Sequence, residues 1–578
     1  MSDPQQVLAA RVQAALGAAF GEPDADPVIR PSQFADFQAN VALPLAKKLN
    51  RRPRDVAAEI VEHLDIADMC EKTEISGPGF INLTLRDEWV AGRAQIMLGD
   101  DRLSVEPTAH PLTTIVEYSS PNVAKEMHVG HLRTTIVGDA LARVLEFLGH
   151  NVIRDNHLGD WGTPYGMLIE HLLDVGEDSD EARLLETDPN AFYQAARGKF
   201  DADEAFAARA RARVVSLQAG DAETMRHWQR LVDLSKVYLN TIYRRLGVTL
   251  TDDDIRGESF YDDMLAETAD QLSARGVGVI SDGALCVFPE GFKGREGDPL
   301  PMIIRKRDGG FNYSTSDLAT IRYRVDKLNV DRIIYVVGSQ QALHFQMLFA
   351  VARMAGWLPE EVKAEHAQIG NVLGSDGKIF RTRSGQSVKL SELLDEAVER
   401  AGGAFDDVPH DEPFDEVGRR EVVGAVGIGA VKYADLSVAR DSEYIFDFDR
   451  MISFRGNTGP YLQYATARNR SIFRKGGLTP DEATGPITLG HDAERGLALH
   501  LLGFGGALEI TGETAEPHRL CAWLFDLASA YTTFFENCPV LKAPDEETKA
   551  SRLALCALTL RTLVKGLDLL GVITPERM

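Results

Sequence analysis

The period of the hydrophobic pattern changes along the chain, and the clearest change surrounds residues 121–131. The segment before it, LTTIVEYSS, is a short apolar and β-branched run bounded by turn residues, which predicts a strand. After it, apolar residues recur at helical spacing from Leu132 to Leu148, and Gly149 follows. This pattern predicts an amphipathic helix that ends at a glycine. Residues 121–131 therefore join a strand to a helix, and HNVIRDN supplies the second strand of a βαβ unit.

The first hundred residues carry a different mixture of patterns. They predict one helix at 5–20 and another around 41–65. The segment EISGPGFINLTL predicts a hairpin, in which INLTL forms an edge strand after the GPGF turn. The proline-bounded stretch PTAHP is typical of a linker. We therefore predict a separate N-terminal α/β module at residues 1–105.

The centre of the chain alternates strands with helices. A helical, charged pattern occupies residues 180–270, and strands return in ALCVFPEGF and PMIIRK. A second strand–turn–helix unit follows in RIIYVVGSQQALHFQMLFAVARMAGW. This order predicts an α/β domain at residues 106–455, whose parallel sheet is split by a helical insertion. From about residue 455 the pattern is almost entirely helical, which predicts an all-α bundle at residues 456–578.

Composition and cysteine usage limit the classes of protein to which the chain can belong. The chain of 578 residues is 44% hydrophobic and 26% charged, which is ordinary for a globular protein of several domains. No apolar run approaches about 20 residues, so we expect no membrane span. The start, MSDPQQVLAARVQAALG, lacks the basic and apolar regions of a secretory signal. The five cysteines are scattered without a CxxC motif, which favours reduced thiols in the cytoplasm.

The charge is distributed unevenly. The net charge of −25, taken alone, argues against a polyanionic partner. From Met451 to Met578, however, 13 basic residues nearly balance 14 acidic ones. A nucleic acid could therefore dock on this end of the chain, although its basic residues could equally form a solvated helix face. The basic residues in question are Arg468, Arg470, Arg474 and Lys475.

The turn before the predicted helix carries the chemistry. It reads SSPNVAKEMHVGHLR, and a strand-to-helix turn presents free backbone N–H groups and the positive end of a helix dipole, which suit a phosphate. His128 and His131 are three positions apart and share one helix face. Gly130 between them lets an adenine or ribose lie close to the backbone. Two alternative explanations of the histidine pair remain. It could bind a metal, but that needs a third ligand, and none is evident nearby. It could also be a coincidence on the surface.

Five segments in this order resemble the arginyl-tRNA synthetases, a family of class I aminoacyl-tRNA synthetases. They are SSPNVAKEMHVGHLR, GDWGTPYG, DGGFNYSTSDLA, SQQALHFQ and GKIFRTRSG. The resemblance runs from GPGFINLTL to the terminal LLGVITPERM. It implies a Rossmann-type catalytic domain, an N-terminal tRNA-contacting module and a helical anticodon-binding domain. It also implies a two-step reaction, in which arginine and Mg²⁺-ATP form arginyl-adenylate and the arginyl group then passes to tRNA(Arg).

The resemblance implies a role for several residues in nucleotide binding. His128, Gly130 and His131 would bind ATP, and His131 would also contact the amino acid. The second nucleotide element of class I enzymes has two lysines, whereas GKIFRTRSG offers Lys378 and then Arg381. Lys125 would supply the missing cation, although it could also be a solvated turn lysine. Which of Lys378 and Arg381 contacts the phosphates stays open.

A pocket for arginine needs carboxylates for the guanidinium and polar groups for the amino and carboxyl ends. Glu117 closes the first predicted strand, so it points into the cleft. Asp317 lies four residues after Tyr313 at a predicted helix start, so the two face one way. A helix N-cap is the alternative role for Asp317, and a core aromatic for Tyr313. The resemblance places these residues around arginine together with Ser120, Asn122, His131 and Gln341.

The partners and the rival functions follow from the same resemblance. The helical end would bind the tRNA anticodon, and tRNA would be needed before arginine is activated. We expect a cytoplasmic monomer with no membrane association. Three other functions are alternatives to this one. They are a class I synthetase for another amino acid, a duplicate enzyme serving resistance or biosynthesis, and an inactive tRNA-binding paralogue. The aromatic candidates for stacking on anticodon bases are Tyr461, Tyr464, Trp523, Tyr531, Phe534 and Phe535.

Overall fold

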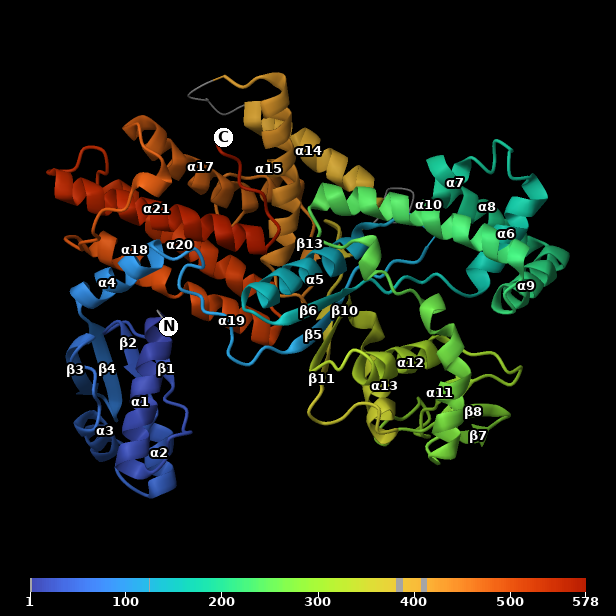
Figure 1. Cartoon of the computed structure of the whole chain (residues 1–578), viewed down its shortest axis with the longest axis horizontal. Helices are drawn as coiled ribbons and strands as arrows, with labels where there is room; N and C mark the ends of the chain where they lie inside the picture. The colour runs from blue at the N-terminus through green and yellow to red at the C-terminus, as the bar shows by residue number, and fades with distance from the viewer. Residues whose placement is uncertain (1–2, 124, 381–387, 407–412) are drawn as a thin grey trace.

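The N-terminal part of the chain is an α/β module at the lower left of Figure 1. The computed structural model describes residues 3–123, 125–380, 388–406 and 413–578. The module holds a four-stranded antiparallel sheet in the order β1-β2-β4-β3. Its elements are α1 (Pro4–Phe20), β1 (Ile29–Pro31), β2 (Phe37–Ala39), α2 (Ala42–Leu49), α3 (Pro53–Glu62), β3 (Cys70–Ser76), β4 (Phe80–Leu85) and α4 (Asp87–Leu98).

Two predictions for this module were wrong in detail. The single helix expected around 41–65 is two helices, because Asn50 ends α2 in the left-handed region (φ 52°) and Pro53 begins α3. The strand INLTL belongs to β4, which pairs with both β2 and β3 and is therefore internal. The edge beside it is β3.

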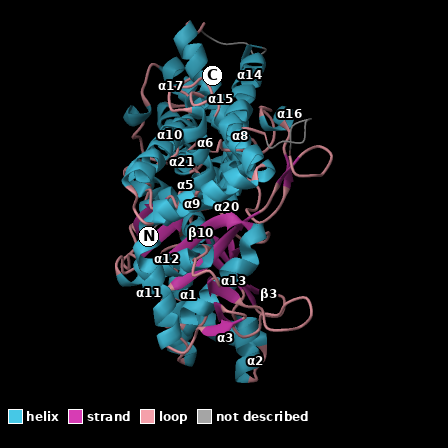
Figure 2. Cartoon of the chain, turned by 90° about the vertical axis from the view of Figure 1, so that its right-hand side faces the viewer, coloured by secondary structure: helices cyan, strands magenta, loops and turns pink. Residues whose placement is uncertain are grey.

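A four-stranded parallel sheet in the order β11-β10-β5-β6 forms the centre of the molecule. The expected strand–turn–helix units are confirmed in it. Strand β11 was not predicted, because its sequence KAEHAQI mixes polar and apolar residues without strict alternation. Figure 2 shows the strands lying among helices. The elements of this layer are β5 (Thr113–Glu117), α5 (Val129–Phe147), β6 (Asn151–Asp155), α12 (Tyr313–Asp326), β10 (Arg332–Gly338), η3 (Ser339–Gln341), α13 (Ala342–Met354) and β11 (Lys363–Ile369).

The insertion between β6 and α12 is helical at first and ends in a small sheet. The strands expected in ALCVFPEGF and PMIIRK are present, but they belong to an antiparallel sheet, β7-β8-β9, separate from the parallel one. In Figure 1 the helices α6 to α10 lie to the right of the parallel sheet. The elements are α6 (Thr163–Val175), α7 (Leu184–Thr187), α8 (Pro189–Ala202), α9 (Glu204–Gln218), α10 (Ala222–Leu246), η1 (Asp252–Asp254), η2 (Glu258–Tyr261), α11 (Asp262–Ala274), β7 (Val279–Ser281), β8 (Ala284–Val287) and β9 (Met302–Arg305).

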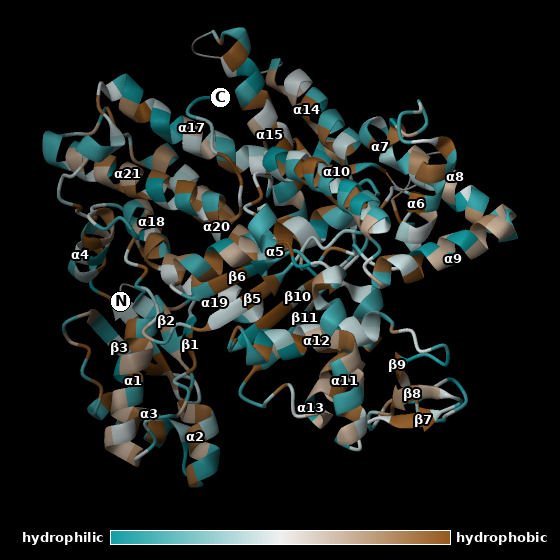
Figure 3. Cartoon of the chain, turned by 45° about the vertical axis from the view of Figure 1, so that its right-hand side comes forward, coloured by the Kyte–Doolittle hydropathy of each residue, from teal (hydrophilic) through white to brown (hydrophobic). Residues whose placement is uncertain are grey.

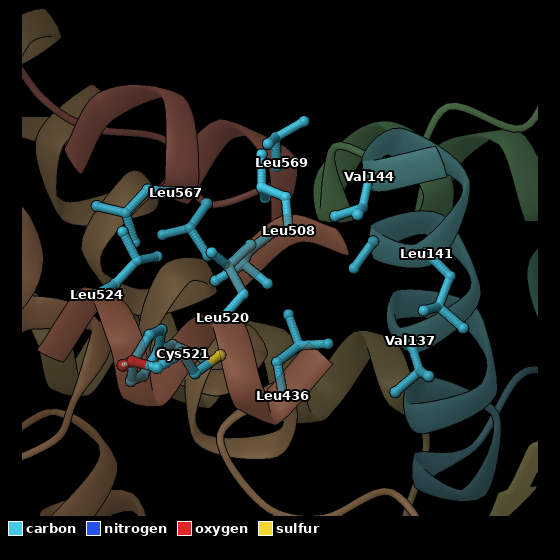
Figure 4. Close-up of a cluster of buried hydrophobic side chains, with 14 of the residues drawn as sticks. Val137, Leu141, Val144, Leu436, Leu508, Leu520, Cys521, Leu524, Leu567 and Leu569 are labelled. Carbon is cyan, nitrogen blue, oxygen red and sulfur yellow. Dashed lines mark hydrogen bonds between the residues drawn. The ribbon is translucent and has the colours of Figure 1, made fainter. Parts of the chain in front are cut away.

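The C-terminal part is helical, as predicted, and it packs against α5. Figure 4 shows Val137, Leu141 and Val144 of α5 facing leucines of the helical domain. Figure 3 shows hydrophobic residues on the central strands and mixed polarity along outer helices such as α9. The elements are β12 (Val372–Leu373), α14 (Leu390–Asp406), α15 (Glu416–Leu436), β13 (Tyr444–Ile445), α16 (Phe448–Met451), α17 (Gly459–Gly476), η4 (Pro480–Glu482), α18 (Asp492–Leu502), α19 (Phe504–Thr514), α20 (Pro517–Asn537) and α21 (Glu546–Leu569).

A buried ion pair joins α5 to α15. Arg133 donates from Nε to Asp435 Oδ1 at 2.9 Å, and the two side chains are 1% and 0% exposed. Nη1 of Arg133 also donates to the carbonyl oxygens of Gly370 (2.9 Å) and Ser442 (2.7 Å). One side chain therefore ties the helix that follows the HVGH turn to α15 and to the end of β11.

The remaining global expectations concern membranes and cysteines. Among the described residues, no helix combines the length and the apolar character that a membrane crossing requires. All five cysteines are buried and unpaired.

Candidate active site

A cleft of about 510 Å³ opens where β5 and β10 end and α5 begins. Parallel strands end at the same edge of their sheet, so residues distant in sequence meet there. Glu117 and Gln341 lie at this edge, as the sequence predicted for Glu117. The cleft is lined by nine of the predicted site residues, which are Glu117, Ser120, Asn122, His128, Gly130, His131, Tyr313, Asp317 and Gln341.

The chain leaves β5 through two residues in the left-handed region. Ser119 has φ 67° and Ser120 has φ 44°, a conformation that costs free energy in residues other than glycine. Hydrogen bonds hold this turn: Thr135 donates to Ser119 Oγ (3.0 Å), and the Ser120 N–H donates to Asn156 Oδ1 (3.1 Å). Such strain is typical of a functional site, and here it turns the chain across the mouth of the cleft.

The two histidines cap the start of α5 and constrain each other. His128 Nδ1 accepts from the Gly130 N–H at 3.0 Å, and His131 Nδ1 accepts from the His128 N–H at 3.1 Å. Because each Nδ1 accepts, each neutral ring carries its proton on Nε2 and can donate it to a ligand. The ring centroids are 3.9 Å apart. A Cβ on Gly130 would lie 2.8 Å from His128 Cε1, so the missing side chain also makes room for this ring.

Both imidazoles are neutral in the free protein near pH 7. Burial lowers the pKa of His131 to about 3, with further lowering from His128 and Lys125. Burial and Lys125 also lower the pKa of His128. The histidines therefore act as hydrogen-bond donors rather than as fixed positive charges.

This charge state predicts a flat pH profile. A lowered histidine pKa means that protonation occurs only below pH 6.5. If the cleft binds ATP and arginine, as the resemblance implies, kcat/KM for ATP at saturating arginine should change less than about twofold between pH 7 and 8.5 in ATP-dependent charging of tRNA. Burial raises the pKa of Glu258, in the same cleft, to about 7, so only a limb of the profile centred well above pH 7 would show that a histidine must change its protonation state.

The acidic side of the cleft is built around α12. Asp317 Oδ2 lies 2.6 Å from His344 Nε2, and the Tyr313 ring lies 5.0 Å from the His344 ring. Asn312 caps α12 by accepting from the Ser314 N–H, so Asp317 is not the N-cap. Tyr313 is 61% exposed, so it is not a core aromatic. Both alternative roles considered from the sequence are therefore wrong.

Glu258 and His157 are two cleft residues that the sequence did not predict. Glu258 comes from η2, and burial raises its pKa to about 7; His157 lowers that pKa, while Asp317 and Asp160 raise it. His157 lies two residues beyond β6, where the argument used for Glu117 could have found it. Glu258 follows no predicted strand or motif, so no comparable signal pointed to it.

The cleft contains one group that resembles a metal site. In the described part of the chain, Glu117, Asp155 and His157 form the only such cluster, with one potential ligand atom each within 4.8 Å of the others. Arg324 Nη2 lies 2.6 Å from Glu117 Oε2 and 3.3 Å from Asp155 Oδ2. The guanidinium already contacts both carboxylates and offsets one of their two negative charges, so this cluster does not fit a resident metal ion.

Two of the predicted cations, Lys125 and Lys378, do not line the cleft. Lys125 places its ammonium 4.3 Å from the centroid of the Tyr193 ring in α8. Lys378 is exposed in a turn, where its carbonyl accepts from the Gly374 N–H at 2.7 Å. Arg381 lies outside the described residues. Phe380, however, does line the cleft, so this segment reaches its rim.

The HVGH sequence begins the helix that follows a strand of the parallel sheet, and an acidic cleft lies beside it. This combination of fold and site defines a class I aminoacyl-tRNA synthetase. Three family models match the chain. They are "tRNA synthetases class I (R), catalytic domain" at residues 94–448, "Arginyl tRNA synthetase N terminal domain" at 6–85 and "DALR anticodon binding domain" at 462–578. The chain belongs to the arginyl-tRNA synthetase family.

Individual relatives agree over the full length. An arginine–tRNA ligase of Thermobifida fusca is 65% identical, with 100% of each chain covered. One from Frankia casuarinae is 51% identical, covering 96% of this chain and 95% of the relative. The crystal structure of arginyl-tRNA synthetase from Plasmodium falciparum superposes with a TM-score of 0.83 at 28% identity, covering 99% of both chains.

Proposed function

We propose that this chain is an arginine–tRNA ligase, which activates L-arginine with Mg²⁺-ATP and transfers it to the 3′ end of tRNA(Arg). One observation carries the proposal. The Nε2 donors of His128 and His131 line the same cleft as the carboxylates of Asp317 and Glu258. A triphosphate and a guanidinium can therefore be held side by side.

The activation step needs positioning and charge stabilisation more than acid–base chemistry. A carboxylate oxygen of arginine forms a bond to the α-phosphorus of ATP, and the bond from that phosphorus to pyrophosphate breaks. No proton has to move, because the arginine carboxylate is already ionised. The backbone N–H groups at the start of α5, with His128 and His131, donate to the phosphates as charge shifts onto them. Mg²⁺ bound to ATP would supply further neutralisation of the phosphate charge.

The acidic side of the cleft supplies the specificity. Asp317 and Glu258 receive the guanidinium, and the exposed ring of Tyr313 lies beside it. Asn122, Ser120 and Gln341 bind the amino and carboxyl ends. Lys125, Lys378 and Arg381 contribute positive charge to ATP binding, as the resemblance implies. The resemblance pairs Glu117 with Asp317 for charge selection, whereas this division gives Glu258 that place beside Asp317.

Asp317→Ala is expected to raise the arginine KM by about 10- to 100-fold, because removing one charged hydrogen bond costs roughly 1.5–3 kcal/mol. The ATP KM should stay within about twofold, since the histidines are untouched. Steady-state charging with each substrate varied in turn measures both constants. Asp326→Ala, an exposed aspartate at the far end of the same helix, is the control. An arginine KM that matches the control would remove Asp317 from the pocket.

We place anticodon binding on α17 and α20. The guanidinium carbon of Arg468 lies 4.0 Å from the centroid of the Phe535 ring, and Tyr464 is 40% exposed. Arg468 and Tyr464 can therefore stack on a base. Tyr531 and Phe534 are buried and belong to the core. We further propose that the enzyme works as a monomer in the cytoplasm, and that arginine activation requires bound tRNA.

The test of the proposed function is ATP–pyrophosphate exchange, with and without tRNA(Arg), for arginine, lysine and canavanine. We expect exchange with arginine, dependent on tRNA, and none with lysine. Exchange driven best by another amino acid would favour a different class I synthetase. Absence of all exchange, with tRNA still bound, would favour an inactive paralogue.

A further inference from the structure

Arg324 is a fully buried arginine that faces the floor of the cleft. It comes from α12, two turns beyond Asp317 on the same side of the helix, and its side chain is 0% exposed. Nη2 donates to Glu117 Oε2 at 2.6 Å and lies 3.3 Å from Asp155 Oδ2. The guanidinium carbon lies 5.1 Å from the centroid of the Tyr335 ring. One side chain of α12 therefore contacts three neighbouring strands of the parallel sheet, β5 and β6 at their carboxyl ends and β10 near its middle.

The two carboxylates that it joins are direct neighbours in the sheet. Glu117 and Asp155 are paired in the register of β5 and β6, and both are buried. Neither oxygen of Asp155 has a hydrogen-bond donor at bonding geometry among the described residues. Two buried carboxylates side by side repel each other, and without a cation one of them takes up a proton.

The surroundings of Glu117 contain few other charges. Burial raises the pKa of Glu117; Arg324 and His157 lower it, and Asp155 raises it. Tyr335 of β10 and Tyr261 of η2 also face Arg324, and burial raises the pKa of both, so they are neutral. The other acids of the cleft, Asp317 and Glu258, come from α12 and η2. Arg324 is therefore the permanent positive charge at this position.

We propose that Arg324 is a positioning residue, which holds Glu117 and Asp155 as an ionised pair and fixes Glu117 to receive a cationic group of arginine. Glu117 lines the cleft while Oε2 is engaged by Arg324, which leaves Oε1 for the substrate. Glu117 thus contacts the substrate through one oriented oxygen, while Arg324 offsets its charge. The negative charge that attracts the substrate guanidinium is supplied by Asp317 and Glu258. This inference rests on the proposed function, and it adds a residue that does not itself touch the substrate.

The experiment replaces Arg324 and follows the arginine KM from pH 6.5 to 8.5. Without the guanidinium the pKa of Glu117 rises further, so the carboxyl is protonated at the lower pH values and ionises as the pH increases. Glu258 titrates near pH 7 in every variant, so the readout is the ratio of variant KM to wild-type KM at each pH. For Arg324→Met this ratio should be roughly tenfold or more at pH 6.5 and should fall as the pH rises. The ATP KM should not change.

Two further variants separate positioning from general damage. Arg322→Met removes another buried arginine of α12, whose partners are Glu267 and Thr268, away from the cleft; it should leave the arginine KM at the wild-type value at every pH. Glu117→Gln combined with Arg324→Met should keep a raised KM, but its ratio to wild type should be constant across the pH range. A constant ratio for Arg324→Met alone, or a falling ratio in the double variant, would overturn the proposal.

The outcome stays interpretable if folding is affected. Should Arg324→Met not fold, Arg324→Gln removes the charge with a side chain that keeps hydrogen-bonding groups, and the same falling ratio is expected. Arg324→Lys keeps a charge and should show a constant ratio. Wild-type protein that fails to charge tRNA with arginine would contradict the proposed function itself, whereas active wild type with a constant ratio in Arg324→Met and Arg324→Gln would contradict only the role of Arg324.

Discussion

His128→Ala is expected to lower kcat for arginyl-adenylate formation by about 100-fold or more, which is the typical cost of losing one donor aimed at charge that develops in the transition state. His128 presents an Nε2 proton because its Nδ1 is occupied by the Gly130 N–H. Its ring lies against that of His131, so the two donors lie side by side at the start of α5. The measurement is single-turnover adenylate formation with saturating substrates. The arginine KM should change much less, because the acidic pocket is intact.

His128 also caps a helix, and a matched variant separates this role from the chemical one. His491 caps α18 in the same way, with Nδ1 accepting from the Ala493 N–H at 3.1 Å, but it is exposed and far from the cleft in sequence. Both alanine variants should lose about 1 kcal/mol or less of stability from the lost cap. Only His128→Ala should lose activity. His128→Asn, which keeps a good cap, should be nearly as inactive; retention of more than a tenth of wild-type kcat would argue against a role for this imidazole.

Arg133→Met is expected to destabilise the protein by about 3–5 kcal/mol, because it leaves Asp435 as an uncompensated buried charge. Burial already raises the pKa of Asp435, and Arg133 opposes that rise. The carbonyl groups of Gly370 and Ser442 also lose their donor. Thermal and urea unfolding, followed by fluorescence, measure the loss.

A double variant provides the control for this prediction. Arg133→Met combined with Asp435→Leu removes both charges, and it should recover most of the lost stability, as replacing a buried pair by apolar groups often does. A double variant as unstable as Arg133→Met alone would show that the carbonyl contacts, rather than the ion pair with α15, account for the stability that Arg133 provides.

Local order was largely predictable from the sequence. The period of the hydrophobic pattern gave the strand, turn and helix of residues 112–148, because those signals depend only on near neighbours. It also gave Glu117 and the paired histidines, since the end of a strand and the start of a helix fix where such side chains point. The pattern failed at β11, whose half-buried residues carry no clear period, and at the break between α2 and α3.

What the sequence determined by itself was therefore the turn, the histidine pair and the order of the elements. The tertiary structure alone decided which charges meet. Glu117 and Arg324 are 207 positions apart and pair only because α12 packs beside the parallel sheet. Glu258 reaches the cleft only because the helical insertion folds back onto it. Local periodicity contains no information about such distant pairs, since their energy arises from burial and charge after the chain has packed.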